Sequence, residues 1–177
     1  MEYFDLVDSR NRVIGKAARQ ECHGNPSNIH RAVHVLVLNE RGEVLIQKRS
    51  VKKDVQPGKW DTSVGGHVNA GESYEEAAHR ETREELGFGL SEPVLMYEYL
   101  LSNEIESEWI RSYCTIYEGP FNPCPVEIDE IQFKSISSID KESPELYTPN
   151  FIEELKFFKN WIRESSRVFS AGMNSIK

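Results

Sequence analysis

The chain has 177 residues, of which 38% are hydrophobic, and it carries a formal net charge of -8 at pH 7. This length suits a single domain, residues 1–177, with a sizeable core. The acidic balance argues against a protein that coats nucleic acid, because phosphate backbones are bound mainly through clustered Lys and Arg. Met1 is followed by acidic and polar residues, and no apolar run approaches membrane-spanning length. We therefore expect a cytoplasmic protein with no membrane or nucleic-acid partner.

Short apolar runs separated by turn residues predict several strands and two helices. The strands are expected over residues 3–7, 12–14, 31–38, 43–49, 60–64, 94–101 and 108–117. The first two form a hairpin, and Pro57 and Gly58 break the chain before a later strand. A closing helix is expected over 150–164, where apolar residues recur at helical spacing. This order indicates an α/β sandwich.

The central helix is predicted by the signals at its two ends. Ser73 followed by Glu76 is a capping-box pattern, so the helix is expected to begin at Ser73. Gly87 or Gly89 supplies the stop. On a helix of about 14 residues, side chains three and four positions apart share one face.

Glu81, Glu84 and Glu85 therefore converge into one carboxylate cluster. Three like charges so close repel each other unless a cation lies among them, and a hard divalent cation such as Mg2+ suits ligands that are all oxygen. Arg80 relieves part of the repulsion, and Glu72 is placed to pair with it. The alternative is a solvated charged face, as on most Glu-rich helices.

A longer pattern contains all of these residues. From Gly66 to Gly87 the chain follows the spacing G-x5-E-x7-R-E-x-x-E-E-x-G. The stretch resembles the Nudix box of the Nudix hydrolase superfamily, here residues 66–88, at every charged and glycine position. Thr82 is the one departure, because a bulky aliphatic residue is usual there. The resemblance implies an α/β fold, namely a Nudix-type α/β/α sandwich with a mixed sheet, here with an N-terminal hairpin and a C-terminal helix.

The resemblance also implies a metal site. Glu81, Glu84 and Glu85 correspond to ligands of Mg2+, for which Mn2+ can substitute, and the carbonyl of Gly65 commonly joins them. The catalytic residues are then these three glutamates together with Arg80.

The implied reaction is metal-dependent hydrolysis of a diphosphate bond. The substrate class is a nucleoside diphosphate linked to another moiety, or a related organic diphosphate. Gly66, Glu72 and Gly87 correspond to structural supports of the box. Two sources are open for the general base: Glu81, or a carboxylate of the loop region 127–130.

Local positive charge for a phosphate is concentrated just before the glycine pair. Arg49, Lys53 and Lys59 are candidate phosphate contacts in this segment. The alternative is that these side chains serve surface solubility alone.

A second resemblance concerns the branch of the superfamily. The lead-in over residues 7–31, VDSRNRVIGKAARQECHGNPSNIHR, looks like that of isopentenyl-diphosphate isomerase and its hydrolase relatives. In the isomerases three histidines and two glutamates build a metal site, and the matching residues here are His23, His30, His67, Glu106 and Glu108. A structural or surface role for these side chains is the alternative.

Gly65 separates this chain from the isomerases. Their reaction needs a cysteine acid/base two residues before the third histidine, and that position is Gly65 here. The isomerase box is also degenerate, whereas this box keeps all its carboxylates. Both differences point to a diphosphate hydrolase on an isomerase-like frame. An isomerase, and a noncatalytic module that binds a nucleotide, stay as alternatives.

Overall fold

The computed structural model describes the backbone of residues 2–174 and the side chains of residues 2–165. Its strands are β1 Tyr3–Val7, β2 Val13–Ala18, β3 His30–Leu38, β4 Val44–Arg49, β5 Trp60–Asp61, β6 Val64–His67, β7 Val94–Ser102, β8 Ser107–Ile116 and β9 Ile128–Lys134. Its helices are α1 Arg19–Cys22, α2 Tyr74–Leu86, α3 Ile136–Ile139, the short 3-10 helix η1 Pro144–Leu146, and α4 Pro149–Asn174. Within the described residues, no helix combines the length and apolarity that a membrane crossing needs.

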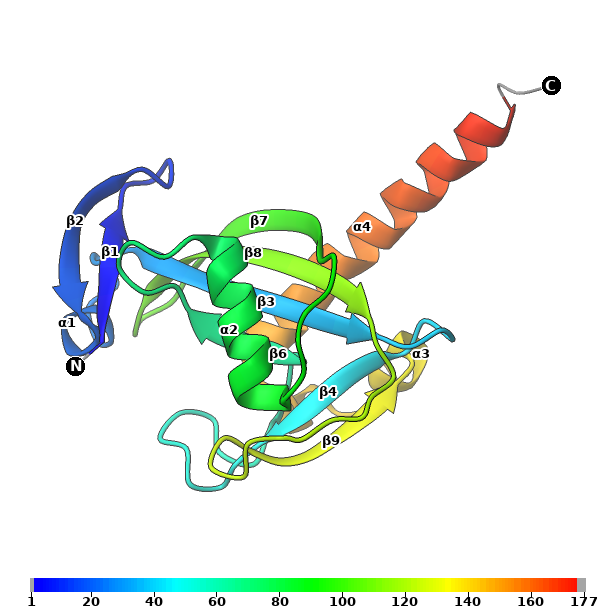
Figure 1. Ribbon diagram of the computed structural model, residues 1–177, viewed down its shortest axis with the longest axis horizontal. Helices are drawn as coiled ribbons and strands as arrows, with labels where there is room; N and C mark the ends of the chain where they lie inside the picture. The colour runs from blue at the N-terminus through cyan, green and yellow to red at the C-terminus, as the bar shows by residue number, and fades with distance from the viewer. Residues whose placement is uncertain (1, 175–177) are drawn as a thin grey trace.

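A mixed seven-stranded sheet forms the centre of the molecule. Its order is β5-β4-β3-β8-β7, with β6 paired to β3 and β9 paired to β4. β3 and β8 run parallel, whereas the other pairs are antiparallel. β3 pairs with β4 only between Leu38 and Val44, so the sheet divides into two halves there (Figure 1). β1 and β2 form a separate two-stranded sheet beside the start of β3.

Two helices cover opposite faces of this sheet because side chains alternate along its strands. Val33 and Val35 of β3 belong to one buried cluster with Ala77 of α2. Leu36 of β3 belongs to a second cluster, which contains Phe151 of α4. α2 crosses in front of the sheet, while α4 passes behind it and extends beyond its edge (Figure 1). The predicted α/β/α sandwich with a mixed sheet is therefore confirmed.

Two predicted elements are longer in the structure. The second strand of the hairpin covers Val13–Ala18, beyond the 12–14 expected, and the closing helix covers Pro149–Asn174, beyond the 150–164 expected. Both extensions reach segments where the apolar period is weak, so the sequence pattern gives no signal for them.

The expected loop over 127–130 was wrong, because β9 begins at Ile128. This strand pairs with β4, and its register shifts between Lys48 and Arg49, which leaves Asp129 without an opposite residue. Such a bulge breaks the period-two pattern by which a strand is recognised in a sequence.

Candidate active site

Helix α2 carries the predicted carboxylates, and the expected residues fix its ends. The Ser73 side chain accepts a hydrogen bond from the Glu76 N–H, and the Glu76 side chain accepts one from the Ser73 N–H, which completes the capping box. Gly87 ends the helix in the left-handed conformation, with φ of 74°. A Cβ at Gly87 would also collide with Asn122. A side chain there is both strained and obstructed.

Gly66 lets β6 approach this helix closely. A Cβ at Gly66 would overlap the carboxyl group of Glu81. Only glycine permits this distance between strand and helix, which agrees with the supporting role expected for Gly66.

Arg80 ties the glycine loop to the helix. Its Nε and Nη2 donate to the two carboxylate oxygens of Glu72 at 2.8 and 2.9 Å, a bidentate pair. Nη2 also donates to the carbonyl of His67 at 2.9 Å. Nη1 donates to Glu81 at 2.6 Å and to Glu84 at 3.3 Å. The guanidinium of Arg80 thus connects Glu72, on the glycine loop, with Glu81 and Glu84, two of the expected metal ligands.

Glu81 and Glu85 are carboxyl groups largely withdrawn from water. Glu85 is 8% exposed and accepts a hydrogen bond from Nε2 of Gln47 at 2.8 Å. Burial, followed by the charge of Glu81, raises the pKa of Glu85 to about 8. Burial also raises the pKa of Glu81, although Arg80 opposes the shift. A cation beside these groups would favour their ionised forms, so the all-oxygen donor set fits a hard divalent ion.

Glu84 is more exposed than these two carboxyl groups. Its side chain is 59% exposed, and Nη1 of Arg80 donates to it as well as to Glu81. Among the described residues, a group of ligand-type side chains whose atoms all lie within 4.8 Å of one another occurs at the histidines instead. The carboxylate cluster is therefore more open than the sequence predicted.

The basic candidates for phosphate contacts are partly engaged within the protein. Arg49 forms an ion pair at 3.1 Å with the aspartate that ends β5. Lys53 forms an ion pair with Glu127, and the charges of both act on Glu85. Lys59 lies half-buried on the same loop. The pair of Lys53 and Glu127 therefore borders the carboxylate cluster.

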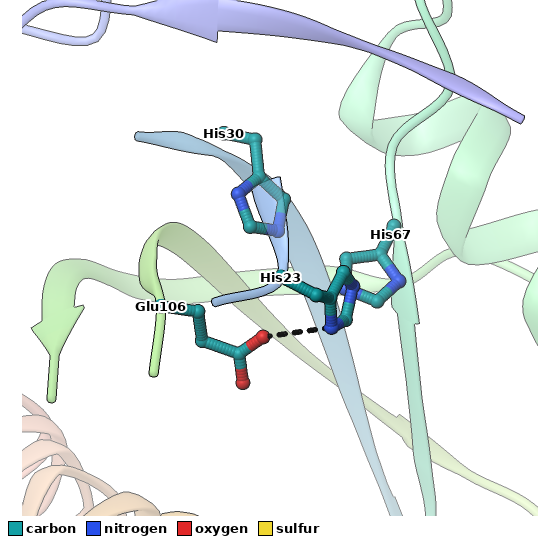
Figure 2. A group of neighbouring side chains, drawn as sticks. All are labelled: His23, His30, His67 and Glu106. Atoms are coloured by element: carbon teal, nitrogen blue, oxygen red, sulfur yellow. Dashed lines mark ion pairs between the residues drawn. The ribbon is translucent and has the colours of Figure 1, made fainter. Parts of the chain in front are cut away.

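The predicted histidines and glutamates meet at one end of the sheet. They come from the residue after α1, from β3, β6 and β8, and from the turn before β8, and are His23, His30, His67, Glu108 and Glu106. Ligand atoms of His23, His30, His67 and Glu106 all lie within 4.8 Å of one another (Figure 2). Nδ1 of His23 lies 3.2 Å from Glu106, and Nε2 of His67 lies 3.1 Å from Glu108. We call these five residues the histidine cluster.

Two ring nitrogens of the histidine cluster are buried without a hydrogen-bond partner among the described residues: Nε2 of His23 and Nε2 of His30. Nδ1 of His30 lies 3.2 Å from the backbone carbonyl two residues earlier, which assigns a ring proton to Nδ1, and Nε2 of the same ring lies 3.5 Å from the carboxylate of Glu108. Burial, then the charge of His67, lowers the pKa of His23 to about 4, so that this ring is neutral near pH 7. A neutral imidazole such as that of His23, beside carboxylates, fits Zn2+ or a similar borderline divalent ion.

Glu108 is the ionised member of the cluster. Burial alone would raise its pKa, but hydrogen bonds with His30 and His67 outweigh burial and lower it below the usual range. A buried carboxylate that stays ionised adds the negative charge that a bound cation requires.

The N-terminal hairpin forms one wall of the histidine cluster. Phe4 of β1 is 1% exposed, and its ring stacks on His30 and His67 with centroids 5.2 and 4.7 Å apart. Docking of β1 therefore orders two of the candidate ligands through their ring faces.

Comparison with known proteins supplies the family. The sequence pattern of the NUDIX domain matches residues 28–155. The chain belongs to the Nudix family. An uncharacterized Nudix hydrolase of Yersinia pestis is 33% identical over 158 residues, which are 89% of this chain and 86% of that protein. Membership makes the protein a hydrolase that cleaves diphosphate bonds of small molecules, as members of this family generally do with a divalent metal.

Two further matches bear on the branch and on the fold. A Nocardia farcinica protein named isopentenyl-diphosphate Delta-isomerase is 31% identical over 171 residues, which are 92% of this chain and 97% of that protein. The crystal structure of a MutT protein from Methanosarcina mazei Go1 is 25% identical, with a TM-score of 0.66 that covers 80% of this chain and 96% of that one. The resemblance to the Nudix superfamily is confirmed, and so is the fold.

Sequence reasoning missed three polar residues of this Nudix hydrolase. Gln47 bonds Glu85, and His34 of β3 is paired with Glu154 of α4 at 2.8 Å. His34 is the one polar residue in the apolar run VHVLVL, and a lone polar residue in such a run is the only local signal it offers.

Proposed function

We propose that this Nudix hydrolase uses Mg2+, for which Mn2+ can substitute, to cleave the diphosphate bond of a nucleoside diphosphate linked to another moiety, or of a related organic diphosphate. The observation that carries the proposal is the complete carboxylate set of α2, in which burial raises the pKa of both Glu81 and Glu85. A module that only binds nucleotides has no need of carboxyl groups kept under mutual repulsion.

Glu81, Glu84, Glu85 and the carbonyl of Gly65 are the groups that would hold the ion. When bound, the ion neutralises diphosphate charge and favours attack of water on phosphorus. Arg80 keeps its bonds to the loop when Glu81 and Glu84 turn toward a ligand, because it is also anchored outside the carboxylate set. The guanidinium then stays beside the diphosphate as a second positive charge.

Two carboxylates are candidates for the proton acceptor. Glu81 lies on α2 itself, and Glu127 is the member of 127–130 whose charge acts on Glu85. Asp129 is less suited, because its carboxylate accepts the N–H of Val51. Turnover that survives Glu127→Gln but not Glu81→Gln would assign the base to Glu81.

The histidine cluster is proposed as a second metal centre. Its gathered ligand atoms, and the neutral ring of His23, support an ion that accepts both nitrogen and oxygen, such as Zn2+ or Mn2+. The number of protein ligands there also favours a resident ion over one that arrives with the substrate.

Isomerase chemistry is the second candidate, favoured by the histidine cluster and by the relative named as an isomerase. It requires an acid/base group at position 65, and Gly65 has no side chain to transfer a proton. Hydrolysis therefore ranks first.

A panel of diphosphates with Mg2+ tests the proposal. It contains nucleoside diphosphate sugars, dinucleoside polyphosphates and isopentenyl diphosphate, and release of monophosphates is measured with and without a chelator. We expect chelator-sensitive hydrolysis of at least one nucleoside compound. Binding without any release would favour the noncatalytic module, and interconversion of isopentenyl diphosphate with its isomer would favour the isomerase.

A further inference from the structure

Gln47 of β4 binds one carboxylate of α2, while Arg80 binds the other two. The guanidinium of Arg80 donates to Glu81 and to Glu84. Glu85 accepts a hydrogen bond at 2.8 Å from Nε2 of Gln47, and these two side chains are 8% and 5% exposed. Glu85 is therefore held by a neutral amide, whereas the other two carboxylates are held by a cation.

The backbone of Gln47 is fixed by neighbouring strands on both sides. Its Cα lies opposite Ile131 of β9 and opposite Asp61 of β5. Leu45, two positions earlier on the same face of β4, belongs to the same buried cluster as Ala77 of α2. Gln47 therefore presents its amide to α2 from a rigid strand, which suits a group that sets the orientation of another side chain.

Two cationic side chains of this region have acidic partners of their own. Lys53, whose charge acts on Glu85, forms an ion pair with Glu127. Arg49, which follows on the same face of β4, forms an ion pair with Asp61 at 3.1 Å. A cation bound directly to Glu85 would neutralise the charge that a metal ion needs, whereas a neutral N–H orients the carboxylate and leaves its charge in place.

We propose that Gln47 is a positioning residue for the divalent ion: its Nε2–H holds Oε2 of Glu85, so that Oε1 of the same carboxylate is the atom that would bind the ion. The inference rests on the proposed function, in which Glu85 is a ligand of Mg2+. The alternative is that the amide only satisfies a buried carboxyl group. Loss of the hydrogen bond would then lower stability and leave the metal affinity of the folded protein unchanged.

Binding of Mn2+, followed through the electron paramagnetic resonance signal of the free ion, tests the inference without turnover. The binding that belongs to α2 is the part that Glu84→Gln together with Glu85→Gln removes. Gln47→Met keeps the length of the side chain and deletes the donor, so we expect it to weaken that part about 10- to 100-fold. Unchanged affinity in Gln47→Met would overturn the inference.

Gln132→Met is the matched control for this exchange. Gln132 of β9 lies opposite Ile46 of β4, whose side chain belongs to the buried cluster on the α4 face of the sheet. The same amide is therefore replaced on the neighbouring strand, but on the face that α2 does not cover. Gln132→Met should bind Mn2+ as the wild type does, and an equal loss in both variants would overturn the inference.

Gln47→Lys separates the neutral amide from a hydrogen-bond donor of any kind. The exchange keeps an N–H donor beside Glu85 and adds a positive charge that opposes the ion. We expect Mn2+ binding at α2 to weaken at least as much as in Gln47→Met. Affinity equal to that of the wild type would contradict the role of the neutral amide and overturn the inference.

The wild-type protein provides a further test in case Gln47→Met folds poorly. With 15N-labelled glutamine, saturating Mg2+ should shift the side-chain amide resonances of Gln47 and leave those of Gln132 in place. Constant Gln47 resonances, with other resonances reporting binding, would overturn the inference.

Kinetics distinguish a failure of the inference from a failure of the proposed function. If a panel compound is hydrolysed, Gln47→Met should raise the Mg2+ concentration that gives the half-maximal rate. An unchanged requirement for Mg2+ would overturn the inference and leave the proposed function intact. Mn2+ binding that the double variant of Glu84 and Glu85 retains in full, or absence of hydrolysis from the whole panel, counts against the proposed function itself.

Discussion

The two candidate metal centres lie on opposite faces of β6 and differ in how complete they are without an ion. Gly66 meets Glu81 on the α2 face, whereas the next residue, His67, points to the other face and joins the histidine cluster. On α2, Nη1 of Arg80 pairs with both Glu81 and Glu84, and the Glu84 side chain stays 59% exposed. The histidine cluster already has ligand atoms of four residues within 4.8 Å of one another. A site that is open at rest suits an ion that arrives with substrate, and an assembled site suits an ion that stays.

The largest expected effect is a loss of hydrolysis when the carboxylates of α2 are replaced. Glu84→Gln together with Glu85→Gln should lower Mg2+-dependent hydrolysis by about 1000-fold or more, because the amides no longer supply negative charge to the ion. The fold should persist, since the exchange removes mutual repulsion. Steady-state kinetics and a melting curve check both points, with Glu75→Gln on the exposed side of α2 as control. Full activity in the double variant would end the assignment of the carboxylates.

The metal content of the purified protein tests whether the histidine cluster holds a resident ion. Replacing His23 and His67 with Ala should remove about one equivalent of tightly bound divalent metal, because it deletes two of the gathered nitrogen ligands. The Glu84/Glu85 double variant should keep that equivalent. Elemental analysis of purified protein measures both, with His79→Ala as control. Equal metal content in all the variants would show that the cluster holds no resident ion.

Breaking the buried pair of His34 and Glu154 should lower the stability of the fold by an amount that depends on pH. Glu154→Gln should destabilise the fold by about 3 kcal/mol near neutral pH, because it leaves His34 without its counter-charge. The folded-state pKa of Glu154 is lowered, so its contribution is present above the unfolded value of 4.5 and is lost as pH falls through the folded pKa. The pKa of His34 is raised, so its contribution is present below 6.5 and is lost as pH rises through the folded pKa.

Urea unfolding at about pH 6 and about pH 3 measures this difference. The loss of unfolding free energy caused by Glu154→Gln should be larger at about pH 6 than at about pH 3. Glu153→Gln, at a neighbouring side chain that is 40% exposed, is the control and should be nearly neutral at both. An equal penalty at the two pH values would contradict an ionised Glu154.

The smallest expected effect concerns the one residue of the box that departs from the family pattern. Thr82 is fully buried, and its Oγ1 has no partner among the described residues. Thr82→Val should stabilise the protein by about 1 kcal/mol, because it removes an unpaired hydroxyl and keeps the shape. Thr82→Ser, which keeps the hydroxyl and removes a methyl group, should destabilise it by a similar amount. Thermal or urea unfolding of the two variants distinguishes these signs.

The carboxylate helix could be predicted because its signals are local. Ser73, Glu76 and Gly87 lie within one helix length of the glutamates they present, and each acts on its nearest backbone. What a local pattern omits is the competition between neighbours. The guanidinium of Arg80 divides its hydrogen bonds among Glu72, the carbonyl of His67, Glu81 and Glu84. This division determines where the carboxylates of α2 lie, and no local pattern expresses it.

The other polar groups depend on contacts between distant parts of the chain. His34 and Glu154 are 120 positions apart, and nothing near either residue specifies the other. The bulge at Asp129 likewise follows from the register of β9 on β4, which the period-two pattern cannot express. Residues of the histidine cluster could be proposed through the resemblance alone, because they come from five separate elements.

The stacking of Phe4 gives the first strand a thermodynamic connection to the histidine cluster. A hairpin that buries the ring of Phe4 against two candidate ligands is favoured by whatever orders those ligands, and it orders them in return. Occupancy of the cluster and protection of the amide hydrogens of β1 should therefore rise and fall together. Exchange at the N-terminal strand therefore reports whether the histidine cluster holds an ion.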